Sequence, residues 1–228
     1  MKHFFSTISK KEVLIPIGIL GVFFFIFFTG QNTFYSEGTC FATELHRIDS
    51  LQSATITNAQ RSDSIGAKFY AIYRQTAIIK RPYMELANNY FSFGSSFALV
   101  LCVSSVFTFI LAFLLAKKGW DNSNLLLKVT FLTFSLITTF NTMAPNVFKN
   151  TENTQKNLDR FKTFNKMQYQ AYEYLTNIEK CKKQGINLDS IVSKLNMRIP
   201  EEQNFMFEVD ISKVTNKTDF ENSFKGLQ

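Results

Sequence analysis

Three long uncharged or nearly uncharged stretches dominate the pattern of hydrophobic and polar positions. They cover residues 13–30, residues 91–116 and residues 125–148, and the only charge among them is Lys128. A helix needs about 20 apolar residues to cross the hydrocarbon core of a bilayer. The pattern therefore predicts three transmembrane helices, with Lys128 reaching the membrane surface through its flexible stem. The alternative for the first stretch, a cleavable signal peptide, is disfavoured because no A-x-A-like pair of small residues follows it.

The polar segments predict further helices. Apolar residues recur at steps of three and four from Ile65 to Tyr90, which is a heptad seam, and again from Phe164 to Cys181. Each of these helices is expected to be continuous with its neighbouring span. Two such helices side by side should pack as an antiparallel, coiled-coil-like stalk. The alternative is that each seam faces a second copy of the chain.

Local signals mark where these helices begin and end. Asp63 or Ser64 is the expected N-cap of the first stalk helix, and Pro82 is its expected kink. A shorter separate helix is expected around residues 41–51. Pro200 is expected to end the helical region.

The pattern changes to strict alternation after Pro200. The residues on one face of the predicted strand are Phe205, Phe207, Val209 and Ile211. A short helix is expected after the strand. Because a lone strand is not stable by itself, this tail is expected to dock onto a protein partner or another copy. A tail that folds onto its own stalk is the alternative.

The expected fold class is an all-α integral membrane protein in five segments, completed by the short strand and helix of the tail. These are an anchor helix (residues 1–30), a helical region running into the second span (31–90), a transmembrane hairpin (91–148), a helical stalk (149–199) and a docking tail (200–228).

The third span carries a polar stripe. At about 100° per residue, its polar side chains gather within a third of the circumference. These residues are Lys128, Ser135, Thr138, Thr139, Thr142 and Asn146. Polar and ionisable groups inside a membrane usually face a bundle interior or a water-filled cavity, so the stripe is a candidate pore lining. The alternatives are polar packing between helices and a buried ligand site.

The second span carries a stripe of small residues. The candidates for close helix packing are Gly94, Ala98, Cys102 and Ser105. The first span is almost wholly apolar and is expected to face lipid. This division of roles favours a homo-oligomer with the third span nearest its axis.

Catalytic and metal-binding patterns are not found. The chain has two histidines, His3 and His46, and no glycine-rich phosphate loop. We therefore expect no enzyme activity, no cofactor and no metal site. The formal charge of +7 is spread along the chain, so no nucleic-acid partner is expected.

Basic residues flank both ends of the spans, so the orientation in the membrane stays open. The basic N-terminus, with Lys10 and Lys11 before the first span, favours the N-terminus inside. Cys40 and Cys181 fall on the same side of the membrane. They could form a disulfide if that side is oxidising, and they would be free thiols in the cytosol.

The segment "KFYAIYRQTAIIKRPYMELANNY", the hairpin, and "FKNTENTQKNLDRFKTFNKMQYQAYEYL" together resemble the SLATT class of small bacterial membrane effectors. In that class a basic helix enters a two-helix hairpin and a charged helix leaves it. The resemblance implies an oligomeric, pore-forming effector of antiviral defence in the bacterial cytoplasmic membrane, partnered with a nucleotide-signalling or sensing protein. The extra first span departs from this pattern.

The chain is also similar to the ExbB/TolQ proton-motor family. The shared features are three spans, a long segment after the first span, and long helices continuing from the second and third. That family's spans are rich in glycine around the ion path, whereas residues 125–148 contain no glycine.

Overall fold

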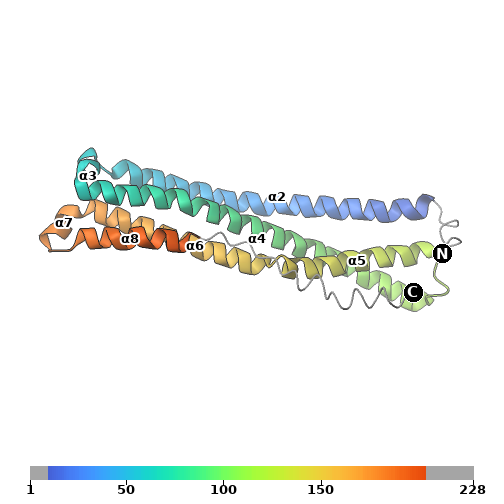
Figure 1. Cartoon of the computed structure of the whole chain (residues 1–228). Helices are drawn as coiled ribbons and strands as arrows, with labels where there is room; N and C mark the ends of the chain where they lie inside the picture. The colour runs from blue at the N-terminus through green and yellow to red at the C-terminus, as the bar shows by residue number, and fades with distance from the viewer. Residues whose placement is uncertain (1–9, 204–228) are drawn as a thin grey trace. The chain divides into compact units, whose positions relative to one another are not determined.

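The computed structural model of the protein describes residues 10–203, and these residues form helices and no strand (Figure 1). The helices are α2 (Lys10–Thr55), α3 (Asn58–Ser62), α4 (Ser64–Lys118), α5 (Leu125–Val147), α6 (Asn150–Thr176), α7 (Ile178–Lys183) and α8 (Leu188–Glu202). The all-α prediction is confirmed for this part of the chain. The predicted strand with Phe205, Phe207, Val209 and Ile211, and the helix after it, lie outside the described residues.

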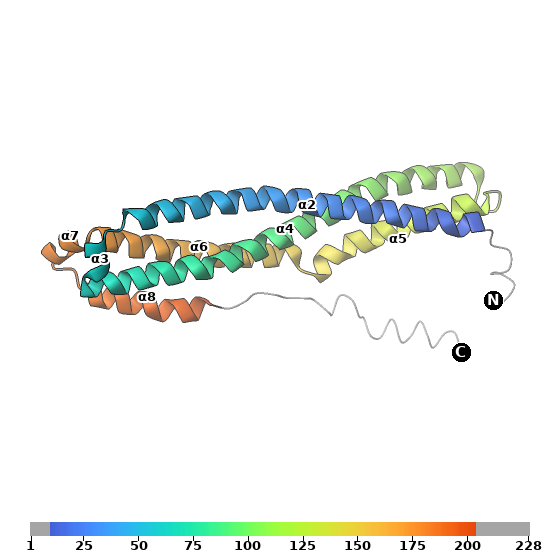
Figure 2. The same cartoon turned by 90° about the horizontal axis from the view of Figure 1, so that it is seen from above.

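Three stretches of helix are long and apolar enough to cross a membrane. They lie within Leu14–Thr55, Ser64–Lys118 and Leu125–Thr176. This finding confirms that the chain has three helices with the length and apolar character that the sequence predicts for membrane spans. Helix α4 also confirms that one helix runs from the stalk segment into the second span. It continues without interruption from Ser64 to Lys118 and contains Pro82 (Figure 2).

Two helix boundaries differ from the prediction. Residues 41–51 are not a separate helix, because α2 continues through them to Thr55. Pro200 does not end the helical region either. It lies inside α8, which ends at Glu202. Pro200 removes one N–H hydrogen bond, but only two residues of α8 follow it, so little helix is disturbed.

The third span and the helix after it are two helices, not one. Pro145 interrupts the ladder near the end of α5, because it has no N–H to donate to the carbonyl one turn earlier. Lys149 then adopts a left-handed backbone with φ 46°. A left-handed residue directly after a helix is a common helix stop. Helix α6 therefore begins anew at Asn150.

The described chain divides into two compact units. The first unit contains residues 10–34 and 91–150, taken from α2, α4 and α5. Phe23 of α2 packs edge-to-face on Phe134 of α5, with ring centroids 5.4 Å apart. Gly30 lets α2 approach α4 closely, since a Cβ atom there would lie 3.2 Å from a methyl group of Leu99. Large apolar side chains such as Phe109, which is 74% exposed, cover the outside, as expected of a surface in contact with lipid.

The second unit contains residues 35–90 and 151–203 of the described chain. Its core is the interface of α4 and α6, where Phe69 stacks on Tyr174 and Tyr83 stacks on Phe164, each pair with ring centroids 5.5 Å apart. These pairs show that the two helices are antiparallel and that both seams pack within one chain. The use of this helix pair as a coiled-coil stalk stays a prediction.

Two further features complete the second unit. Helix α8 covers the core with a buried row consisting of Leu188, Val192, Leu195 and Ile199. The turn into α4 is capped by Asp63, whose Oδ2 accepts a hydrogen bond from the Gly66 N–H at 3.1 Å, so one of the two expected N-caps is confirmed. Gly66 is required there, because a Cβ atom would lie 1.9 Å from the carbonyl oxygen of Gln60.

Candidate functional site

Part of the polar stripe of α5 packs against α4, and the rest is exposed on the surface of the chain. Thr138 packs: its hydroxyl donates to Ser104 Oγ at 3.0 Å and lies 3.1 Å from Thr108 Oγ1, so it joins α5 to α4. Ser135 Oγ is buried and has no hydrogen-bond partner among the described residues. At Thr138, polar packing between helices is therefore the observed role.

The next part of the stripe lies on the surface of the chain. Thr139, Thr142 and Asn146 are exposed. The Thr139 and Thr142 hydroxyls donate to carbonyl oxygens one turn earlier, at 2.9 and 2.8 Å, and the Asn146 amide does so at 3.3 Å. Such bonds satisfy the donors but leave the oxygens able to accept further hydrogen bonds. Three polar side chains thus remain on the outside of a helix that is apolar enough to cross a membrane.

Lys128 lies apart from the rest of the stripe. It belongs to the first turn of α5, and its Nζ lies 5.5 Å from the ring centroid of Trp120 in the hairpin loop. Tryptophan and lysine near the end of a span are typical membrane-surface anchors. The structure therefore favours an anchoring role for Lys128 over pore lining.

The packing row predicted for the second span is largely wrong for contacts within the chain. Gly94 does approach another helix, since a Cβ atom there would lie 3.5 Å from Cβ of Asn150, the first residue of α6. The other three predicted residues, Ala98, Cys102 and Ser105, are exposed. The contacts are made instead by a second small-residue row with the buried residues Ser92, Ser96, Val100 and Ser104. Helix α4 carries two such rows, and spacing alone does not tell which one faces inward.

The exposed rows of α4 and α5 share one face of the first unit. On α4, Ser96 lies against Gly30 of α2, Ser104 contacts α5, and Ser105 comes next around the helix. On α5, rotation in the same direction leads from Phe134, which contacts α2, through Thr138, which contacts α4, to the exposed Thr142. The two helices run antiparallel, so the same direction of rotation around each helix leads to the same side of the pair. Both exposed rows therefore lie on the side of α4 and α5 that faces away from α2. We call this surface the polar face; it consists of Ala98, Cys102, Ser105, Thr139, Thr142 and Asn146.

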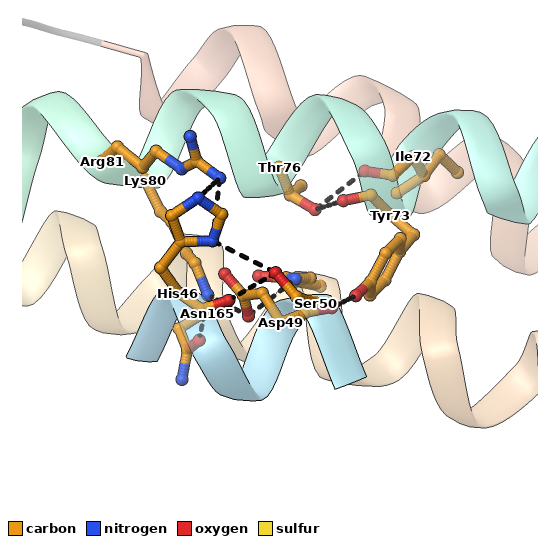
Figure 3. Close-up of polar contacts among 10 residues, drawn as sticks. His46, Asp49, Ser50, Ile72, Tyr73, Thr76, Lys80, Arg81 and Asn165 are labelled. Carbon is orange, nitrogen blue, oxygen red and sulfur yellow. Dashed lines mark hydrogen bonds and ion pairs between the residues drawn. The ribbon is translucent and has the colours of Figure 1, made fainter. Parts of the chain in front are cut away.

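A buried ion pair lies at the centre of the second unit (Figure 3). Lys80 of α4 is 2% exposed, and its Nζ donates to Asp49 Oδ1 of α2 at 2.8 Å and to Asn165 Oδ1 of α6 at 2.9 Å. Gln168 donates to the same Asp49 oxygen at 3.1 Å. The Tyr73 hydroxyl donates to the backbone carbonyl of Asp49 at 2.8 Å. One network thus connects α2, α4 and α6.

Burial sets the electrostatics of this network. Loss of water on burial lowers the pKa of the Lys80 ammonium. The hydrogen bond to Asp49 and the charge of Asp49 oppose this change, whereas the positive charge of Arg81 adds to it. A buried pair of this kind gives little net stability, but removing one partner strands the other charge in a dry interior.

A cavity of about 310 Å³ lies beside the ion pair. It is lined by Tyr35, Thr39, Ala42, Thr43, Leu45, His46, Asp49, Lys80, Arg81, Met84, Glu85 and Phe161. Nη2 of Arg81 lies 3.3 Å from Nε2 and 3.4 Å from Nδ1 of His46, and Figure 3 shows the imidazole between the guanidinium and Ser50. The sequence prediction missed this site. The available signal was the position of Lys80 within the heptad seam of residues 65–90, one helical turn after Thr76, which is also buried.

Of the two alternatives for Cys40 and Cys181, the structure has the free thiols and not the disulfide. Cys40 is exposed on α2, about 22 Å of helix before Thr55. Thr55 contacts Tyr172, and Cys181 comes after Tyr172 on α7. The two thiols are therefore at opposite ends of the second unit, whereas a disulfide needs Cα atoms within about 7 Å. Within residues 10–203, no group of three or more histidine, cysteine, aspartate or glutamate side chains could hold a metal ion.

No protein-family model, curated protein or solved structure matches this chain. Its function must therefore be inferred from the polar face and from the network of the second unit.

Proposed function

We propose that the chain is a non-enzymatic membrane protein that self-assembles through the polar face and conducts ions along α5. The observation that carries this proposal is the exposure of Thr139, Thr142 and Asn146 on a helix apolar enough to span a bilayer. Polar side chains are unfavourable against lipid, so a second copy or a water-filled path is the better neighbour for them. The small side chains Ala98 and Cys102 beside them let helices of other copies approach closely.

The stalk gives this assembly a place to receive a signal. Helix α4 belongs to both units, so a change in its packing in the second unit can be passed along one continuous helix. As the resemblance to SLATT-type effectors implies, we place the protein in a bacterial cytoplasmic membrane as an effector of antiviral defence.

A second candidate function is an accessory or scaffolding subunit of a larger membrane complex. The hydrogen bonds of Thr138 to Ser104 and Thr108 favour it, because they show polar groups used only to hold helices together. In that case residues 200–228 would dock onto the partner.

The conduction path is tested by replacing both Thr139 and Thr142 with leucine. Both side chains are exposed and hydrogen-bond only within their own helix, so the fold should persist. We expect ion flux through liposomes containing the purified chain to fall at least about tenfold, because apolar side chains dewet a path. Met143→Leu, an exposed neighbour off the polar face, should keep its flux. Unchanged flux in the double variant would contradict the pore assignment.

Self-assembly is tested separately with Cys102 as a reporter on the polar face. We expect a short bis-maleimide to cross-link the Cys40→Ala, Cys181→Ala variant into dimers in liposomes, because copies that meet through this face bring their Cys102 thiols together. The matched control, Cys102→Ala with Cys40 and Cys181 kept, should give no such dimers. A Cys102 thiol that reacts with a monofunctional maleimide but never cross-links would argue for the accessory-subunit function.

A further inference from the structure

We propose that the cavity beside the Lys80–Asp49 pair binds a small zwitterion, a molecule with one ammonium and one carboxylate group such as an α-amino acid. The site lies wholly in the second unit, between α2 and α4 with one wall from α6. The proposal goes beyond the conduction path and stands without it.

The charges around the cavity are balanced. Two cations, Lys80 and Arg81, and two carboxylates, Asp49 and Glu85, line it together with His46. A ligand with a single charge would be attracted by one pair and repelled by the other. A ligand with one positive and one negative end can place each end beside a lining residue of opposite charge.

Arg81 provides the place for the carboxylate of the ligand. Its guanidinium contacts the His46 ring and makes no ion pair with any carboxylate among residues 10–203. A guanidinium can donate two parallel hydrogen bonds to a carboxylate, which makes it the preferred partner for that group. Lys80 adds one unused N–H, because Asp49 and Asn165 accept only two of its three protons.

Asp49 and Glu85 provide the place for the ammonium. Both hydrogen bonds to the Asp49 carboxylate end on Oδ1, so Oδ2 accepts none from the described residues. The Asp49 side chain is 13% exposed, and it lines the cavity. Glu85 follows Arg81 by one helical turn, which places the two side chains on the same stretch of the cavity wall. Among residues 10–203, Glu85 and Arg81 form no ion pair with each other.

The rest of the lining favours a ligand with an apolar side chain. Leu45, Met84 and Phe161 contribute apolar surface from three different helices. A volume of about 310 Å³ holds an amino acid of the size of leucine together with ordered water. Pockets of this kind, mostly apolar with a few polar groups that fix orientation, are typical of small-molecule sites.

The ligand class is tested by calorimetric titration of the full chain in detergent micelles. The probe is L-leucine, and its matched analogues are 4-methylpentanoate, which lacks the ammonium, and 3-methylbutylamine, which lacks the carboxylate. We expect L-leucine to bind and each analogue to bind at least about tenfold more weakly, since each loses one charge-assisted contact. L-methionine and L-glutamine extend the panel to other side chains. Binding of none of the three amino acids, or equal binding of a one-charge analogue, would overturn the proposal.

The location is tested with Arg81→Gln. We expect this variant to weaken L-leucine binding at least about tenfold because it removes the carboxylate partner. Arg74→Gln, an exposed arginine of the same helix that does not line the cavity, is the matched control and should bind as the unaltered chain does. Circular dichroism checks that both variants keep their helices. Undiminished binding by a folded Arg81→Gln variant would show that the site is elsewhere.

Discussion

Replacing Asp49 by alanine is expected to lower the free energy of unfolding by about 3–5 kcal/mol, the usual cost of stranding one charge of a buried pair. Lys80 would keep only Asn165 as an acceptor inside the core. Lys80→Met should cost less, because methionine fills the space with an uncharged side chain. A urea titration followed by circular dichroism in micelles measures both.

The control for this prediction is an exposed ion pair. Glu44 and Arg47 pair on the surface of α2, where both side chains are more than half exposed. Glu44→Ala should leave the urea midpoint unchanged, because exposed pairs contribute little. The double variant Asp49→Ala, Lys80→Met should be more stable than Asp49→Ala alone. If it is not, the lysine is not the stranded group.

The stability of Asp49→Ala should depend on pH in a defined direction. Burial already lowers the pKa of Lys80, and in Asp49→Ala the hydrogen bond and the charge of Asp49 no longer oppose that change, while the charge of Arg81 still adds to it. A lysine whose pKa is lower in the folded state than in the unfolded state binds more protons when unfolded, so stability rises with pH between the two values. We expect the deficit of Asp49→Ala to shrink from neutral pH towards pH of about 10, the ordinary range of lysine.

Local patterns predicted the spans and the seams because these depend on one helix at a time. The absence of charge from 91–116 and the apolar steps from Ile65 to Tyr90 are properties of a single chain segment. The end of α5 at Val147 was missed although Pro145 was visible, because the apolar pattern continues past it. The separate roles of Thr138 and Thr142 were not predictable, since they depend on where α4 lies.

The buried ion pair could not be predicted for a related reason. Asp49 and Lys80 are separated by 31 residues, and a charged residue in a polar segment is normally solvated. Their burial results from three helices meeting at one level, with Asn165 and Gln168 of α6 completing the hydrogen bonds. Lys80 lies on the seam face of α4, but a single sequence does not show which carboxylate would join it.

Replacing Phe164 by alanine is expected to destabilise the second unit by about 3–5 kcal/mol, the range for removing a buried phenylalanine. Phe164 is fully buried and stacks on Tyr83 with ring planes 17° apart. Tyr169→Ala, an exposed aromatic residue on the same helix, is the matched control and should change stability little. Urea unfolding of both variants measures the difference.

The dependence of this loss on protein concentration tells whether the α4–α6 seam is made within one chain. Because Tyr83 and Phe164 belong to the same chain in this structure, the loss should be the same after a tenfold dilution in micelles. If the seam were made between two copies, the urea midpoint of the unaltered chain would fall on dilution. The urea midpoint of Phe164→Ala would then no longer depend on protein concentration. Self-association through the polar face would not imitate that result, because Phe164 lies in the other unit. The dilution series therefore separates assembly through the membrane helices from assembly through the stalk.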